Sequence, residues 1–349
     1  MSSAFSDVIS LSDNSCSAFD DVITSSQTPQ RFYMTYARSR PNELIPWIEE
    51  HNVPLLTNAI HRWSDNTDRF LDMWEYDTPH VIDAGGYNVM ASYVTQSGSL
   101  RSDVSLSDVT AEKQRKQLPF YPYTLEEYHE WLCSHSDEIE WATVMDYACE
   151  DRFNKLWDYE QRIEKTLEAT IRQQNLVDDM PSSQSYKILP VLQGRKPQDY
   201  IDCYNRLKAH GVNVDHVGIG TVCRLSSEKR IVEFEQAIRD NTDVDRLHGF
   251  GVKIQAFNHG ASFESADSQA WVYNASNGEV AIDGDGRLRT IPCDQSLIRT
   301  VESFKNYYNY VTRLQQGEKA VEFDSVVDPS LSDDTAVEKL YNQYDEMIS

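Results

Sequence analysis

Short apolar segments recur along the chain from Arg31 onward, separated by longer stretches with a different periodicity. These segments are rich in β-branched and aromatic residues and lack strict alternation with polar residues, as expected of strands buried on both faces. We therefore predict strands over Phe32–Ala37, Val53–Ile60, His80–Asp83, Trp141–Met145, Lys187–Leu192, His216–Gly220, Leu247–Lys253 and Ser265–Tyr273.

Several of the intervening stretches carry helix signals. The sequence Thr124-Leu125-Glu126-Glu127 is a capping box, which predicts the start of a helix that continues through Trp131 and Leu132. From Asp151 to Gln174 the apolar residues are three and four positions apart, which is helical spacing. We predict further helices over Pro197–His210, which opens on a proline, and from a cap at Ser226 or Ser227 to about Asp240.

Eight strands with interleaved helices predict an α/β fold, a (β/α)8 TIM barrel, over residues 30–290. Residues 291–349 would add C-terminal helices packed on the barrel, near Leu297–Leu314 and Val337–Met347. In such a barrel the chemistry lies at the carboxyl ends of the strands.

Two segments do not follow the alternation. Residues 1–29 are rich in Ser and Asp and predict a disordered tail, in which Ser3–Ile9 and Ser17–Ile23 form a weak repeat. Residues 91–119 form a polar, Ser-rich insertion with basic residues at Lys113, Arg115 and Lys116. This insertion is compatible with a mobile lid, with a nucleic-acid contact and with an inert surface loop.

The composition is that of a globular protein, and its charge is strongly acidic. The formal net charge is −24, and only 12 of the 32 basic residues are Lys. A nucleic-acid-binding protein is expected to carry a basic footprint, so this charge counts against such a partner unless another cause explains it. An acidic, lysine-poor surface is typical of proteins that work in concentrated salt, and we favour this explanation over an ordinary acidic surface with local basic patches.

The sequence indicates an intracellular location. No apolar stretch approaches the roughly 20 residues of a membrane span, and the N-terminus has no secretory signal pattern. The six cysteines, 16, 133, 149, 203, 223 and 293, contain no Cys-x-x-Cys pair and predict free thiols in a reducing compartment. We therefore expect a cytoplasmic protein, in the host cytoplasm if it is viral, with no membrane partner and no metal site.

Polar groups and glycines follow several of the predicted strands. The third strand ends in Asp83-Ala84-Gly85-Gly86-Tyr87, and the fourth ends in Val144-Met145-Asp146. The fifth ends in Gln193-Gly194, the sixth in Gly218-Ile219-Gly220, and the last contains Asp267. Each residue alone has an ordinary structural explanation as a cap, a turn or a surface acid. Their shared position at strand ends predicts a site that combines carboxylates, a carboxamide and exposed backbone, which suits a planar base.

This ordered set resembles the tRNA-guanine transglycosylase superfamily, in which Asp-Ser-Gly-Gly-Phe-Gln, a strand-end Asp, Val-Gln-Gly, a Gly-rich strand end and a nucleophilic Asp follow one another. The sequences Val217–Arg224 and Ala266–Trp271 are most similar to the DNA-modifying 7-deazaguanine transglycosylases, the DpdA-type enzymes. The resemblance spans roughly Phe32 to Tyr273.

The resemblance implies a role for each matching residue. Asp267 would be the nucleophile that displaces guanine, and Asp83 would transfer the proton on the base nitrogen. Tyr87 would stack on the base and Asp146 would accept hydrogen bonds from its N1/N2 edge. Gln193 with Gly194, together with a backbone N–H at Gly218 or Gly220, would bind O6. The predicted reaction exchanges guanine in DNA for a 7-deazaguanine base, preQ0 or a derivative, through a covalent Asp-glycosyl intermediate.

One departure from the superfamily bears on the substrate. The tRNA enzymes carry a Cys-x-Cys-x-x-Cys plus His zinc site after the nucleophile, whereas this region contains Cys293 alone. We therefore expect no zinc subdomain, no cofactor, and DNA rather than tRNA as the partner, beside the free 7-deazaguanine base. The target guanine would be single-stranded or flipped out of a duplex. A homodimer is compatible with the sequence.

Three alternatives remain open at this stage. One is a tRNA-guanine transglycosylase that has lost its zinc site. Another is a retaining glycoside hydrolase, which also needs paired acids at a barrel mouth. The third is a non-catalytic barrel that binds nucleic acid or a protein partner.

Overall fold

The computed structural model describes residues 29–36, 44–72, 78–115, 118–181, 186–223, 225, 227–252, 255–284, 287–316 and 338. The predicted N-terminal tail and the predicted helix near Val337–Met347 thus lie outside the described residues, apart from residues 29 and 338. None of the helices in these ranges combines the length and the hydrophobicity of a membrane span.

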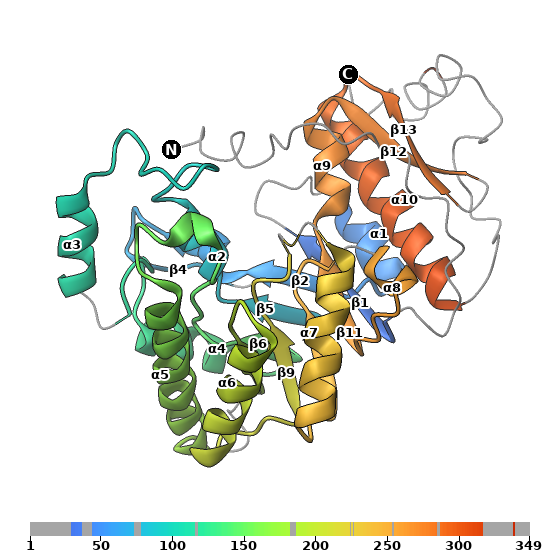
Figure 1. The fold of residues 1–349 in the computed structure, drawn as a ribbon. Coiled ribbons are helices and arrows are strands. Elements are labelled where there is room, and N and C mark those ends of the chain that lie inside the picture. The colour runs from blue at the N-terminus through green and yellow to red at the C-terminus, as the bar shows by residue number, and fades with distance from the viewer. Residues whose placement is uncertain are drawn as a thin grey trace.

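A parallel β-barrel forms the centre of the molecule (Figure 1). Its strands pair in the order β7-β6-β5-β2-β1-β11-β10-β9-β8. Every neighbouring pair in this order is parallel. The strands are β1 (Arg31–Tyr36), β2 (Leu55–Asn58), β5 (His80–Asp83), β6 (Trp141–Thr143), β7 (Ile188–Leu189), β8 (Val191–Leu192), β9 (His216–Ile219), β10 (Arg246–Gly249) and β11 (Ser265–Ser268).

The two ends of this strand order are consecutive pieces of one strand. β7 and β8 are separated only by Pro190, which has no N–H to contribute to a ladder. β7 pairs with β6 on one side and β8 pairs with β9 on the other. The carbonyl of Pro190 also accepts a hydrogen bond of 2.8 Å from the N–H of Gly218, which is part of β9. The ring of eight strand positions is thereby closed, which confirms the predicted (β/α)8 barrel.

Helices cover the outside of the barrel between most consecutive strands (Figure 1). The segment between β2 and β5 differs, because its described residues form a 3-10 helix (Ala59–His61) and the short hairpin β3 (Trp63–Ser64) and β4 (Arg69–Phe70). The helices are α1 (Ile45–Glu50), α2 (Gly86–Ala91), α3 (Leu106–Arg115), α4 (Leu125–Ser134), α5 (Tyr159–Asp178), α6 (Pro197–Ala209), α7 (Glu228–Asn241), α8 (Gln255–Asn258), α9 (Ala270–Ser276) and α10 (Ser296–Gln316).

The start signals predicted from sequence are correct at α4 and misplaced at α5. At α4 both halves of the capping box form, between the side chains and backbones of Thr124 and Glu127. The helix predicted from Asp151 begins only at Tyr159, because the Asp158 side chain accepts the N–H of Gln161 and caps the helix there. Residues Asp151–Phe153 form a separate 3-10 turn.

The last predicted strand is too long. β11 ends at Ser268, where the serine Oγ accepts the N–H of Ala270 and the chain turns into α9. Trp271 is then fully buried on α9, with its ring 5.0 Å from that of Phe304 on α10. The predicted strand over Ser265–Tyr273 is therefore wrong beyond Ser268, because tertiary burial of Trp271 favours the helix.

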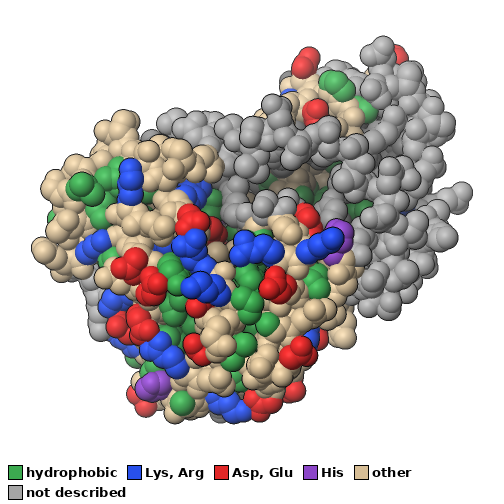
Figure 2. Space-filling view, in the orientation of Figure 1, with side chains coloured by type: hydrophobic (Ala, Val, Ile, Leu, Met, Phe, Trp, Pro, Cys, Tyr) green, Lys and Arg blue, Asp and Glu red, His purple; other side chains and the backbone are tan. Residues whose placement is uncertain are grey.

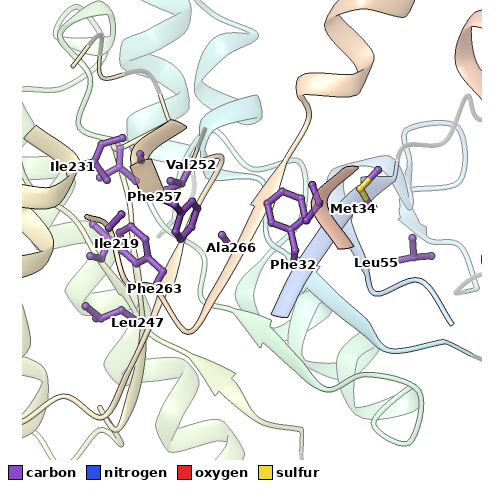
Figure 3. Close-up of a cluster of buried hydrophobic side chains, with 14 of the residues drawn as sticks. Phe32, Met34, Leu55, Ile219, Ile231, Leu247, Val252, Phe257, Phe263 and Ala266 are labelled. Atoms are coloured by element: carbon purple, nitrogen blue, oxygen red, sulfur yellow. The ribbon is translucent and has the colours of Figure 1, made fainter. Parts of the chain in front are cut away.

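The end of the described chain packs together beside the barrel. β12 (Glu279–Gly284) and β13 (Arg287–Pro292) form an antiparallel hairpin that lies with α9 and α10 in Figure 1. α10 corresponds to the helix predicted near Leu297–Leu314. Its residues join a large hydrophobic cluster whose barrel members include Phe32, Met34 and Ala266, which Figure 3 shows.

The insertion predicted over residues 91–119 has regular structure among its described residues. It contains α3 and a β-bridge between Val94 and Leu100. Val109 and Leu118 are buried in a second hydrophobic cluster together with residues of α2 and α4. Whether the insertion acts as a lid stays a prediction.

Candidate active site

Each predicted site residue except Tyr87, which lies on α2, is in a barrel strand or within three residues of its end. Asp83 is the last residue of β5, and Asp267 is the third residue of β11. Asp146, Gln193 and Gly220 follow β6, β8 and β9. Because all barrel strands are parallel, their carboxyl ends meet at one rim, and these side chains are brought to the same mouth.

Asp83 is anchored by its own turn and by the neighbouring strand. Its Oδ1 accepts the N–H of Gly85 at 3.1 Å, and its Oδ2 accepts the Asn58 side-chain amide at 2.9 Å. Asn58 stands opposite Asp83 in the β2–β5 register. Burial raises the pKa of Asp83 to about 6, against the lowering effect of the Gly85 hydrogen bond, and the nearby Asp267 charge raises it further. Asp83 can therefore take up and release a proton near neutral pH.

The Gly-Gly turn lets two acidic strand ends approach each other. Gly85 has φ +89°, and a Cβ there would lie 2.3 Å from Asn58 Oδ1. A Cβ on Gly86 would lie 2.2 Å from Asp146 Oδ1. Side chains at either glycine would displace Asn58 or Asp146, so the bare backbone is required for packing of the site itself.

Asp146 and Gln193 form a buried hydrogen-bonded pair. Gln193 Nε2 donates to Asp146 Oδ2 at 2.5 Å. Gln193 is 1% exposed and Asp146 is 9% exposed. Burial raises the pKa of Asp146 to about 7, the charge of Asp83 raises it further, and the Gln193 hydrogen bond opposes the shift. Asp146 and Asp83 thus interact electrostatically as well as through the glycine contact.

Asp267 is held at both carboxylate oxygens. Thr35 Oγ1 donates to Oδ2 at 3.1 Å, and the Gly251 N–H donates to Oδ1 at 2.9 Å. The Nε2 of the fully buried His248 lies 3.4 Å from Oδ1. With 6% of its surface exposed, Asp267 is a rigidly oriented carboxylate of the kind that can attack a fixed electrophile.

Tyr87 lies on α2 at the same mouth and is held by two residues that follow β6. Its hydroxyl accepts a hydrogen bond of 2.6 Å from Arg152, whose guanidinium lies 5.6 Å from the centre of the ring. The Tyr87 ring also packs edge-to-face on Phe153 at 5.5 Å. These contacts orient the ring, and its stacking on a base stays a prediction.

The predicted glycines pack tightly, and two of their amides are used within the sheet. The N–H groups of Gly218 and Gly220 donate to the carbonyls of Pro190 and Leu192 at 2.8 and 2.9 Å. A Cβ on Gly220 would lie 2.3 Å from Gln193 Nε2, and one on Gly194 would lie 2.6 Å from Asp199 Cβ. Gly194 and Gly220 are also joined by Tyr200, whose hydroxyl lies 3.0 Å from both carbonyls.

Three residues that sequence reasoning missed hold the site together, namely Thr35, Asn58 and His248. Asn58 is the last residue of β2, but the predicted strand ended at Ile60, so its position at a strand end was not evident from the sequence. Thr35 and His248 had no signal either, because their roles depend on which strands become neighbours. In the described ranges, no three His, Cys, Asp or Glu side chains are grouped so that they could hold a metal ion.

Comparison with known proteins identifies a family for most of the site. Residues 112–308, more than half of the chain, match the model of a family described as DpdA, DeoxyPurine in DNA protein A. A search of curated proteins found no match. The matched segment contains Asp146, Gln193 and Asp267, while Asp83 and Tyr87 precede it. This match confirms the resemblance inferred from the strand ends.

Proposed function

Because the chain belongs to the DpdA family, DeoxyPurine in DNA protein A, we propose that it is a DNA-modifying transglycosylase that exchanges guanine for a 7-deazaguanine base. The observation that carries this proposal is the convergence of Asp83, Asp146, Gln193 and Asp267 at one barrel mouth. Two of the carboxyls, those of Asp83 and Asp146, have pKa values raised to about 6 and 7, and Asp267 is fixed at both oxygens. Such a division of roles among neighbouring acids suits combined nucleophilic and proton-transfer chemistry.

The proposed reaction consists of two displacements at the sugar C1′. In the first, an oxygen of Asp267 forms a bond to C1′ as the bond from C1′ to guanine breaks, and the departing base takes a proton from Asp83. In the second, the incoming 7-deazaguanine loses its N9 proton to Asp83, and that nitrogen attacks C1′ and releases Asp267. Two inversions give net retention, as in retaining glycosidases.

Base recognition would use the buried pair and the neighbouring backbone. Asp146 would accept hydrogen bonds from N1 and N2 of the base, and the second hydrogen of Gln193 Nε2 would bind O6. The backbone N–H groups of Gly218 and Gly220 already donate within the sheet. We therefore assign the backbone N–H that also binds O6 of the base to the next residue, Thr221. Tyr87 would cover one face of the base.

The direct test is an exchange assay. Purified protein is incubated with radiolabelled guanine and with DNA or tRNA, and label in the polymer is counted. We expect incorporation into DNA, most efficiently into single strands, and none into tRNA. In parallel, DNA from cells that express the chain and receive preQ0 is digested, and its nucleosides are analysed by mass spectrometry. Label in tRNA alone would contradict the proposal, as would unmodified DNA together with no exchange in vitro.

DNA would approach the mouth through a mixed but locally basic rim. Figure 2 shows Lys and Arg side chains, interspersed with acids, across the upper ends of α5, α6 and α7. Lys155 and Lys196 follow β6 and β8 on this side of the barrel, and both are exposed. They are suited to contact backbone phosphates of a strand that enters the site.

Replacing both lysines should weaken DNA binding in a salt-dependent way. For Lys155→Gln with Lys196→Gln, the slope of log K against log salt should fall by about 1.4, or about 0.7 for each lost single-strand contact. Lys208→Gln is the control, since Lys208 is exposed near the C-terminal end of α6, away from the mouth. An unchanged slope measured by salt titration would place the DNA elsewhere.

A further inference from the structure

Thr221 has an unusual backbone conformation beside the site. It follows Gly220 at the end of β9, and its φ is +62°. This left-handed region suits glycine, while a β-branched residue there is a genuine outlier. Strained residues persist where surrounding structure requires them, and they cluster at functional sites. Because Thr221 adopts this strained conformation, we expect contacts of its side chain to hold it there.

The Thr221 hydroxyl connects the ends of three strands. It accepts the N–H of Cys149, which follows β6, at 2.7 Å. It donates to Gln193 Oε1, which follows β8, at 2.6 Å. The Cys149 amide can only donate, and a hydroxyl has a single proton, so that proton is directed to Gln193.

This contact fixes the oxygen end of the Gln193 carboxamide, while Asp146 accepts from its nitrogen end. The oxygen and nitrogen ends of a carboxamide are nearly equal in shape, and their hydrogen-bond partners decide the orientation. With Oε1 bound to Thr221, Nε2 faces Asp146 Oδ2. Gly220 packs directly against this amide, because a Cβ there would lie 2.3 Å from Nε2. One hydrogen of Nε2 goes to Asp146, and the other remains to bind a ligand.

We propose that Thr221 is a positioning residue that keeps the Gln193 amide nitrogen in the base site and thereby selects 6-oxo purines over 6-amino purines. The inference rests on the proposed function in taking a purine base as the ligand. The Gln193 Nε2 hydrogen can pair with the carbonyl oxygen at position 6 of a 6-oxo purine. The amino group of a 6-amino purine would instead place a second donor opposite it. Sites that leave a buried polar group unpaired reject a ligand strongly.

The test compares two substitutions that differ only in the hydroxyl. Thr221→Ser keeps the hydroxyl, Thr221→Ala removes it, and both lack the γ-methyl group, so changes in packing and backbone strain are matched. Calorimetric titration of the full chain gives Kd for free guanine and for 2,6-diaminopurine, which differ at position 6 and in the protonation of N1. We expect the ratio of the two Kd values to stay near that of the wild type in Thr221→Ser and to shrink at least about tenfold in Thr221→Ala.

A second variant without the hydroxyl keeps the test decisive if Thr221→Ala does not fold. Thr221→Gly tolerates the positive φ and should show the same loss of selectivity as Thr221→Ala. Equal Kd ratios in the Ser, Ala and Gly variants would overturn the inference, as would a parallel weakening of both ligands. Selective binding without any exchange on DNA would contradict the proposed function alone. Failure of the wild type to bind either purine would contradict both.

Discussion

Replacing Asp267 by Asn or Ala should abolish base exchange, with a loss of at least about 10³-fold in turnover. The physical reason is that a glycosyl-enzyme intermediate needs a carboxylate oxygen to bond to C1′, and a carboxamide is a far weaker nucleophile. Labelled guanine incorporation into DNA measures the loss. The wild type should in addition form an adduct with DNA that survives denaturing electrophoresis, and both variants should lack this adduct.

The surroundings of Asp267 make the Asn variant a fair test. Asn retains an oxygen that can accept the Gly251 N–H, and its amide group can donate to Thr35, so the fold should be preserved. Asp215→Asn is a matched control because Asp215 is an exposed acid just before β9, on the opposite side of the barrel. Full exchange activity in Asp267→Ala would show that the nucleophile is a different residue.

The barrel was predictable because its strands are buried on both faces. Short segments with apolar centres, such as His80–Asp83, are then enough to predict the strands. The order of the strands along the chain is also their order around the ring. The predicted strand bounds were wrong where tertiary packing overrides the local sequence pattern. Trp271 belongs to an apolar run that reads as strand, yet it is buried on α9 against Phe304. Pro190 lies within one predicted strand but divides it into two pieces that close the barrel.

The candidate site was predictable only in part, for a geometric reason. A polar residue at the end of a parallel strand lies at the mouth of the barrel, and this rule found Asp83, Asp146 and Gln193. Asp267 lay inside the predicted strand Ser265–Tyr273, and its role was inferred from the family resemblance. The residues that hold them depend on pairing between strands. Thr35 reaches Asp267 because β1 pairs with β11, although 232 positions separate the two residues. No periodicity within one segment reports such a contact.

The two raised pKa values predict that the site destabilises the protein as pH rises. An isolated Asp in the unfolded chain has a pKa of 3.8, while the folded values are about 6 for Asp83 and about 7 for Asp146. The folded state therefore binds these protons more tightly, so the contribution of these two groups to stability is greatest below about pH 4 and is lost as pH rises through 6 and 7. This is opposite in sign to the usual contribution of a salt-bridged acid.

Asp146→Asn should consequently be more stable than the wild type at neutral and alkaline pH. Since one pKa unit corresponds to about 1.4 kcal/mol, the gain in free energy of unfolding at pH 8 should be about 2 to 4 kcal/mol. The gain should grow between about pH 4 and 7 and stay constant above. Denaturant titrations of the wild type and the variant at pH 4.5, 6, 7 and 8 measure it. A stability difference that is independent of pH would contradict the prediction.

The same variant should lose base binding, because the carboxamide offers a donor where the N1/N2 edge of guanine also presents donors. Asp137→Asn removes an exposed acid at the other end of the barrel, in the loop before β6, and should show neither the gain in stability nor the loss of binding. A gain in stability together with a loss of binding would indicate that the buried acids are kept for the reaction at the expense of the fold. The cost arises from burial and from the charge of a neighbouring acid, which is Asp267 for Asp83 and Asp83 for Asp146. The same two causes bring the pKa values of Asp83 and Asp146 close to neutral pH, where proton transfer is efficient.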